Sequence, residues 1–190
     1  SIGSYTTVNI SCPNAFGGQP FTDKKSLEYL LNALSQFPKL KPIFIKLSPD
    51  LSEQELDDII EIAEKYSIDG FISSNLTKNR DNVKIKNAVP SVGGMSGKVV
   101  EDLSNNLIRY IYKKTNGKKI IIGCGGVFSA LDAYYKIKAG ASLIQMITGM
   151  IFEGPQIISN INLGLVKLLE RDGFKNISEA IGTENENNRR

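Results

Sequence analysis

The sequence predicts an α/β fold built on a parallel sheet, and two patterns carry this prediction. Five short apolar runs rich in β-branched residues recur along the 190 residues, as is typical of buried parallel strands. Amphipathic helical patterns separate these runs, and repeated strand–helix units form either a doubly wound sheet or a barrel. We expect one domain over residues 1–190, because the length and the 41% hydrophobic content suit a single core.

The elements alternate strictly along the chain. The expected strands are Tyr5 to Ser11, Pro42 to Leu47, Gly70 to Ser74, Lys119 to Gly123 and Ser142 to Ile147. The expected helices are Lys24 to Ser35, Ser52 to Tyr66, Glu101 to Thr115, Ala130 to Ala139 and Pro155 to Glu170. Ser52 and Glu55 form a capping box, and Gly173 is a suitable terminator. Five strands cannot close an eight-stranded barrel, so local sequence leaves the two architectures open.

Composition excludes several classes of function. The net charge of +3 comes with lysines spread along the chain, which argues against nucleic-acid binding. No apolar run approaches the about 18 residues that a membrane span requires. The chain contains no histidine, which excludes Ser-His-Asp triads, Cys-His pairs and histidine-ligated metals, and we expect no metal site. Cys12 and Cys124 match no disulfide or metal spacing, which favours a reducing, cytoplasmic setting.

Polar residues gather where the predicted strands end, and both architectures place their active sites there. The first strand runs into Asn9, Ser11, Cys12, Pro13 and Asn14. Amides and a thiol could bind and deprotonate a small molecule. Taken alone, however, the cluster is better explained as a turn that buries a small cysteine.

The next two strands add a cation and further donors. Lys46 interrupts an apolar strand, and a buried lysine is rare. It either reaches solvent at the strand end or points into a pocket, where its charge could hold a phosphate or stabilise an anion on a cofactor. The third strand ends in Ser73, Ser74 and Asn75, which add donors at the same edge.

Three glycine-bearing segments indicate a phosphorylated ligand. They are Gly93 to Gly97, Gly123 to Gly126 and Gln145 to Gly149. The last two follow the final two strands, where barrels commonly bind phosphate through backbone N–H groups. The long polar stretch from Leu76 to Lys98 is either a lid or a surface excursion.

Six motifs in order, VNISCPN, IKLSPDLS, DGFISSNLT, GGMSGK, IIIGCGGV and AGASLIQMITGMIFEGP, resemble the dihydroorotate dehydrogenase family. The resemblance spans nearly the whole chain. It implies the C-terminal part of a (β/α)8 TIM barrel, from the fourth strand to the C-terminus, with the first half missing. The start on a strand-like segment without Met agrees with a fragment.

The resemblance also implies a reaction and its residues. FMN would lie across the barrel mouth and oxidise dihydroorotate to orotate in de novo pyrimidine (UMP) biosynthesis, taking a hydride at N5 while a base removes the C5 proton. By motif, Cys12 is the catalytic base and Asn9, Asn14 and Asn75 bind substrate. The residues assigned to FMN are Asn9, Lys46, Ser74, Gly97, Gly125, Gly126, Ile147 and Thr148. Lys46 would stabilise the anionic reduced ring.

The electron acceptor divides the family. A cysteine base is typical of the soluble members that use fumarate or NAD, whereas the chain from Gly93 onward is more similar to the quinone-dependent members. We favour quinone on the longer match. Peripheral contact with the inner membrane through an upstream part, and a homodimer, are both compatible with this interpretation.

Two rivals remain. A dihydropyrimidine dehydrogenase would share the FMN barrel and the cysteine base, but the cysteine clusters of its iron–sulfur part are absent. A half-barrel that binds phosphate without catalysis is the non-enzymatic alternative. Cys124, within a glycine segment, is expected to be structural.

Overall fold

The computed structural model describes residues 2–12, 21–81, 84–85 and 88–186. Its centre is a five-stranded sheet in which every neighbouring pair is parallel. The strands are β1 (Thr6–Asn9), β2 (Ile43–Leu47), β3 (Gly70–Ser73), β4 (Ile120–Cys124) and β5 (Leu143–Gln145). All five predicted strands are therefore confirmed, each with shorter or shifted ends.

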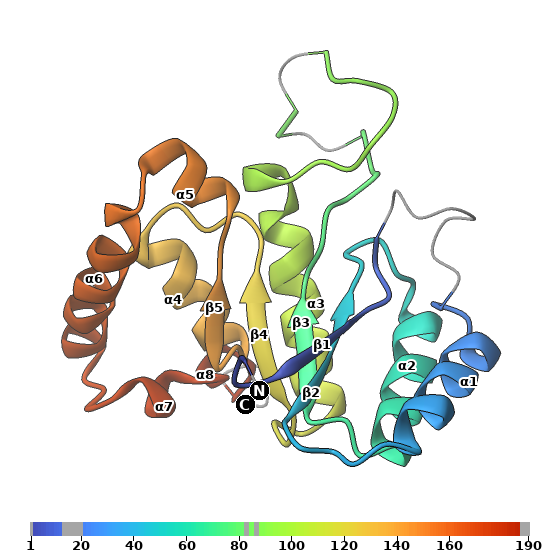
Figure 1. The fold of residues 1–190 in the computed structure, drawn as a ribbon. Helices are drawn as coiled ribbons and strands as arrows, with labels where there is room; N and C mark the ends of the chain where they lie inside the picture. The colour runs from blue at the N-terminus through green and yellow to red at the C-terminus, as the bar shows by residue number, and fades with distance from the viewer. Residues whose placement is uncertain (1, 13–20, 82–83, 86–87, 187–190) are drawn as a thin grey trace.

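The strand order decides between the two architectures that the sequence leaves open. The strands lie in the sheet in the order in which they occur in the chain, β1-β2-β3-β4-β5. A doubly wound sheet reverses its order at a switch point, whereas a barrel adds strands consecutively and keeps its helices outside. Figure 1 shows the main helices wrapped around one face of the curved sheet, with the opposite face open. The fold is thus the parallel, singly wound type of a barrel segment.

The helices agree closely with the sequence patterns. They are α1 (Lys24–Ser35), α2 (Glu53–Lys65), α3 (Glu101–Lys114), α4 (Ala130–Ala139), α5 (Thr148–Glu153), α6 (Gln156–Asp172), α7 (Ile177–Ala180) and α8 (Thr183–Glu186), with a short 3-10 helix η1 (Gly97–Val100) before α3. The Ser52 and Glu55 side chains form the predicted capping box, and Gly173 ends α6 in the left-handed conformation. Helices adjacent along the sheet pack side by side, α1 on α2 and α4 on α6.

Helix α5 was not predicted. Its sequence was assigned to a glycine-bearing loop because Gly149 lies in it. A Cβ at Gly149 would stand 2.2 Å from the carbonyl oxygen of Val127. Glycine is therefore required at this position by close packing of the helix on the loop after β4.

The two faces of the sheet have different environments. Side chains such as Ile45, Phe71 and Ile121 point toward the helices and belong to the main core, where each is fully buried. Alternate residues point to the open face, where Phe44, Ile72 and Ile122 form a smaller cluster. Period-2 alternation along parallel strands produces this division.

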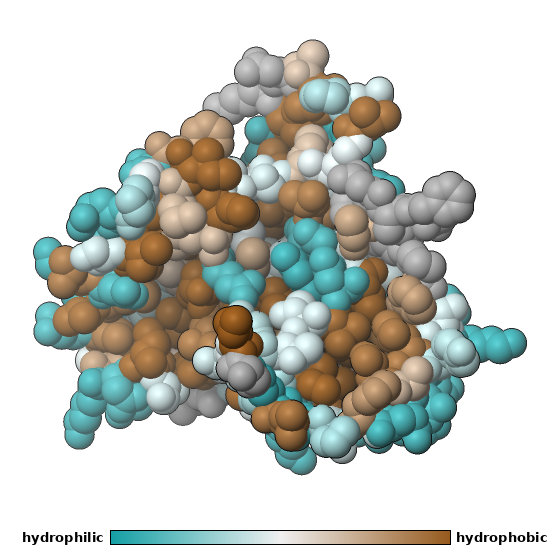
Figure 2. Space-filling model, in the orientation of Figure 1, coloured by the Kyte–Doolittle hydropathy of each residue, from teal (hydrophilic) through white to brown (hydrophobic). Residues whose placement is uncertain are grey.

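The open face is only partly covered. Leu143 and Ile120, which belong to edge strand β5 and its neighbour β4, are 54% and 43% exposed. Figure 2 shows apolar surface on both sides of this face, over α5 and α6 on the left and beside the sheet on the right. On the outer elements, Phe152 and Leu163 are 76% and 64% exposed. Parallel sheets are normally buried on both faces, so this face is the part of the fold that lacks cover.

Among the helices that the structure describes, none is long and apolar enough to span a membrane.

The capping box of α2 supports a stability prediction. The Ser52 hydroxyl accepts from the Glu55 N–H, and the Glu55 carboxylate accepts from the Ser52 N–H at 2.8 Å. We expect Ser52→Ala to lower the free energy of unfolding by about 1 kcal/mol. Urea denaturation followed by circular dichroism measures this loss. The control is Ser35→Ala at the end of α1, whose hydroxyl donates to the Asn32 carbonyl oxygen at 2.7 Å but caps no backbone N–H. Equal stability of the Ser52 variant and wild type would contradict the prediction.

Candidate active site

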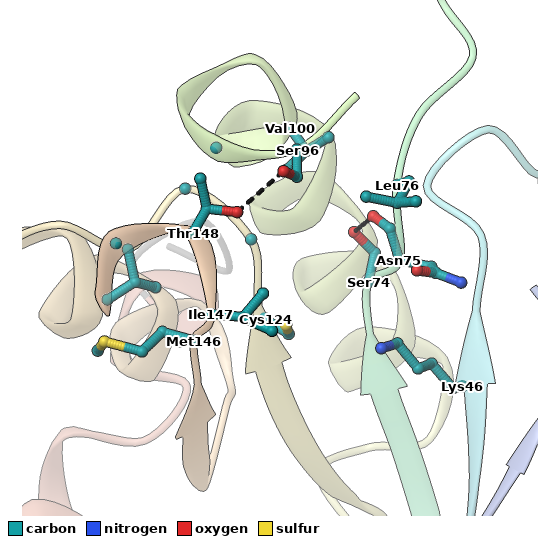
Figure 3. A pocket seen from close by; sticks show the side chains of 15 residues that line it. Lys46, Ser74, Asn75, Leu76, Ser96, Val100, Cys124, Met146, Ile147 and Thr148 are labelled. Carbon is teal, nitrogen blue, oxygen red and sulfur yellow. Dashed lines mark hydrogen bonds between the residues drawn. The ribbon is translucent and has the colours of Figure 1, made fainter. Parts of the chain in front are cut away.

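A pocket of about 70 Å³ opens at the carboxyl ends of β2 to β5. Eight of the predicted site residues line it. They are Lys46, Ser74, Asn75, Gly97, Gly125, Gly126, Ile147 and Thr148. Figure 3 shows that they come from different elements: Lys46 from β2, Ser74 and Asn75 from the end of β3, and Ile147 and Thr148 from the start of α5. The parallel strands bring these residues together although they are far apart in sequence.

One end of the pocket is a glycine turn after β4. Gly125 and Gly126 both have positive φ angles, +118° and +74°. A Cβ at Gly126 would stand only 2.4 Å from Cβ of Glu101, at the start of α3. No other residue fits this turn. The turn therefore packs closely on α3 while its backbone remains at the pocket wall, as a phosphate-binding loop requires.

Hydroxyl groups face this glycine turn. The Thr148 hydroxyl donates to the Ser96 hydroxyl at 2.9 Å, which joins the start of α5 to the segment before η1 (Figure 3). Gly97 follows, and a Cβ there would lie 3.3 Å from Cγ2 of Thr148. Ser96 did not stand out in the sequence, because a serine within a glycine-bearing segment is indistinguishable from a turn residue.

Lys46 confirms the expectation of a lysine that faces a pocket. In the register of the sheet it pairs with Asn9 on β1 and with Ile72 on β3, so it belongs to the open face. It is half-buried and lines the pocket. Because its side chain lines the pocket, its charge can act on a group that enters there.

Cys124 is the last residue of β4 and also lines the pocket, which the sequence did not predict. Burial raises the pKa of its thiol, and the charges of Lys46 and Lys136 oppose that rise only in part. The thiol is therefore neutral near neutral pH. The prediction that Cys124 has a structural role remains open, because its side chain is part of the wall.

Asn9, Ser11 and Asn75 form one hydrogen-bonded cluster. The Ser11 hydroxyl donates to Oδ1 of Asn9 at 2.9 Å. Nδ2 of Asn75 donates to the hydroxyl and to the carbonyl oxygen of Ser11, at 3.0 and 2.9 Å. These bonds use the amide oxygen of Asn9 and the amide nitrogen of Asn75. Ser11, fully buried, was not predicted to have a site role.

Cys12 follows this cluster directly and is half-buried with a free thiol. It does not line the pocket that contains Lys46 and Ser74. The predicted substrate residue Asn14 lies outside the described residues. Cys12 and Asn9 therefore lie toward β1, the glycine turn and Thr148 lie toward β4 and β5, and Asn75 joins the two groups because it lines the pocket and bonds Ser11.

The segment between Leu76 and Lys98 is anchored at its base. Thr77 and Met95 pair through two backbone hydrogen bonds of 3.0 and 2.8 Å. Asp50, after β2, accepts from the Thr77 hydroxyl and from the Lys78 N–H. Figure 1 shows residues 76–81 and 88–96 extending beyond the carboxyl ends of the strands. This position agrees with both sequence interpretations, a lid and a surface excursion.

The donor set suits a flavin mononucleotide. The glycine turn and the Ser96 and Thr148 hydroxyls would hold its phosphate, and no Cβ obstructs the backbone at Gly125 and Gly126. Lys46 is the cation that a flavin pyrimidine would meet. No group in this set is a typical metal ligand, and within the described parts of the chain no cluster of three or more acidic or cysteine side chains is suited to a metal ion.

Fold and site together define a class: part of a (β/α)8 barrel with a glycine-lined pocket at the carboxyl ends of its strands. A sequence model of the dihydroorotate dehydrogenase family matches residues 1–169. The chain belongs to that family.

Comparisons with individual relatives indicate the same family. The chain is 41% identical over 182 residues to the quinone-type dihydroorotate dehydrogenase of Natronomonas pharaonis, and 42% identical over 191 residues to that of Nostoc punctiforme. Each alignment covers 96% of this chain and 51% of the relative. A ligand-free dihydroorotate dehydrogenase structure from Eimeria tenella superposes with a TM-score of 0.87 at 29% identity, over 95% of this chain and 55% of that one. The chain thus spans about half the length of the relatives that it matches.

The raised pKa of Cys124 gives a chemical prediction. In a Cys12→Ser protein, only Cys124 can be alkylated. Because the thiolate is the reactive form, we expect iodoacetamide to modify Cys124 at least about tenfold more slowly than a free peptide thiol near neutral pH, with the rate rising only at alkaline pH. Intact-mass spectrometry measures this rate. Alkylation at neutral pH as fast as that of the peptide would contradict the prediction.

Proposed function

We propose that this chain forms the catalytic C-terminal half of an FMN-dependent dihydroorotate dehydrogenase that oxidises dihydroorotate to orotate in pyrimidine biosynthesis. The observation that carries the proposal is the pocket at the strand ends. It combines a glycine turn for a phosphate, a lysine for an electron-rich ring and amides for a small polar substrate, in a chain that belongs to this family. The non-enzymatic half-barrel explains the glycine turn but gives no reason for the other groups.

The proposed roles of the residues differ with their position in the site. The glycine turn and the Thr148 and Ser96 hydroxyls bind the phosphate of FMN, and Ser74 and Lys46 contact its ring. Bound FMN supplies the hydride acceptor. The positive charge of Lys46 stabilises negative charge that develops on the ring. Water is excluded on the sheet side by the apolar cluster of the open face.

Substrate binding and proton transfer belong to the β1 side. Asn9 offers an amide N–H and Asn75 an amide oxygen, which match a ring that carries both carbonyl and N–H groups. Cys12 takes the C5 proton. A thiol suits this role, since its ordinary pKa lies close enough to neutrality for a modest change of environment to generate the basic form. Asn14 completes the substrate contacts.

We propose quinone as the electron acceptor, because the relatives at about 40% identity are named as quinone-type enzymes. Cys12 is the observation that favours the second candidate, a fumarate- or NAD-dependent enzyme. An assay of the full-length protein with each acceptor separates them. Reduction of a soluble quinone analogue at a rate far above those of fumarate and NAD supports the proposal; the reverse order supports the alternative. Peripheral membrane attachment would accompany quinone use.

The flavin itself provides the central test. Full-length protein should purify with FMN, and anaerobic dihydroorotate should bleach the visible absorbance of the oxidised flavin. Cys12→Ala should retain FMN and lose about 100-fold or more of the bleaching rate, because only the proton acceptor is removed. The matched control is Cys124→Ala, which should bleach at nearly the wild-type rate. Protein that binds no flavin would refute the dehydrogenase function, and an unimpaired Cys12→Ala would refute the base.

The Ser11 bridge yields a separate prediction. Ser11→Ala removes the hydroxyl that holds the Asn9 and Asn75 amides in their orientations. We expect KM for dihydroorotate to rise about tenfold while the FMN content stays unchanged, because one hydrogen bond of this kind contributes about 1 kcal/mol or slightly more. Steady-state kinetics and flavin absorbance measure both quantities. An unchanged KM would show that the amides orient themselves without Ser11.

A further inference from the structure

Lys136 on α4 is a buried cation that the proposed reaction does not use. Its side chain has no exposed surface. Its ammonium donates to the Ser104 hydroxyl at 2.9 Å and to Oδ1 of Asn105 at 2.8 Å. Both of these partners are neutral, so no carboxylate is directly bonded to the charge in the described parts of the chain. A buried ammonium costs free energy unless its surroundings compensate the charge.

The fold makes room for this lysine. A Cβ at Gly123, on the helix-facing side of β4, would lie 3.1 Å from Cδ of Lys136. The glycine therefore lets the lysine stem cross the strand and reach α3. Gly123 belongs to a segment that the sequence assigned to phosphate binding, and its structural reason is the passage of this side chain.

Ser104 links Lys136 to the backbone at the edge of the pocket. Its hydroxyl contacts the carbonyl oxygen of Cys124 at 2.9 Å and that of Ser73 at 3.0 Å, the last residues of β4 and β3. The Cys124 carbonyl also accepts from the Ser74 N–H at 2.7 Å. Because Lys136 donates to the Ser104 oxygen, the hydroxyl proton is directed toward these carbonyls. Two strand ends that enter the pocket are thereby held together.

We propose that Lys136 is a positioning residue for a phosphate group bound at Gly125 and Gly126. It fixes the backbone that leads into the glycine turn, and it places a positive charge behind that turn. The inference rests on the proposed function, since the phosphate is that of FMN. It assigns a role to a residue that does not itself touch the pocket.

Four charged or titratable side chains act on Lys136. Glu101 on α3 and Asp132 on α4 are the nearest acids, and Lys98 pairs with both, at 3.0 and 2.6 Å. Cys124 on β4 is the remaining titratable neighbour. The pKa of Lys136 is lowered to about 8, and burial is the main cause. Glu101, Cys124 and Asp132 oppose this lowering, whereas Lys98 adds to it.

This balance predicts a pH dependence with a definite sign. Below about pH 8 the ammonium is charged and favours a phosphate dianion. Above that pH the free protein loses the proton, and the bound phosphate must restore it. By linkage, FMN affinity falls as the pH rises. Riboflavin shares the flavin ring but lacks the phosphate, so its affinity should not follow this titration.

The experiment compares the two flavins in full-length protein freed of its cofactor, with binding followed by flavin fluorescence. Lys136→Met should weaken FMN binding about tenfold near neutral pH, because it removes both the charge behind the glycine turn and the charge-assisted hydrogen bond that orients Ser104. Its affinity for riboflavin should remain unchanged, and its FMN affinity should no longer fall above about pH 8. The control is Lys138→Met on the same helix, whose ammonium lies near Asp172 at the surface.

Four outcomes would overturn the inference. Equal losses of FMN and riboflavin affinity in Lys136→Met would indicate only a damaged fold. If the wild-type affinities for FMN and riboflavin depend on pH in the same way, the charge of Lys136 does not act on the phosphate. This measurement uses only wild-type protein, so it decides the question even if the variant does not fold. Wild-type protein that binds neither flavin would overturn the proposed function as well. If the wild type binds FMN and Lys136→Met binds it equally tightly, this inference alone would be overturned.

Discussion

The parallel register of the five strands is the constraint on which the site depends. Because all strands run the same way and follow one another in chain order, their carboxyl ends share one edge. That edge receives Lys46 from β2, Asn75 from the loop after β3 and the glycine turn after β4. A reversed strand anywhere in this series would send its polar end to the opposite edge. The strand topology therefore determines which residues can meet at the site.

The sequence predicts those parts of the site whose signals are local. Lys46 stands out because a charge interrupts an apolar strand, and Gly125 and Gly126 stand out because glycines follow a strand. The capping box of α2 likewise lies within four residues. These features require no knowledge of distant contacts, and each is found where the pattern indicates.

Other parts depend on contacts that no local pattern contains. Ser11 and Ser104 resemble ordinary serines in the sequence, yet each bonds a partner more than 30 residues away, Asn75 for Ser11 and both Ser73 and Lys136 for Ser104. Gly149 and Gly123 resemble phosphate-loop glycines, but close packing explains both. Lys136 sits in an amphipathic helix where a lysine is expected at the surface. Only the packing of α4 on β4 shows that it is buried.

The open face of the sheet limits what this half can do alone. Side chains such as Leu143 and Ile120 are left exposed on a face that parallel sheets normally bury. The pocket lies at the rim of the same face, so a flavin bound there would be covered on one side only. In the function proposed above, charge stabilisation by Lys46 and proton transfer to Cys12 would both gain strength when water is excluded. The proposed roles of these residues therefore depend on an environment that is completed by whatever covers the open face.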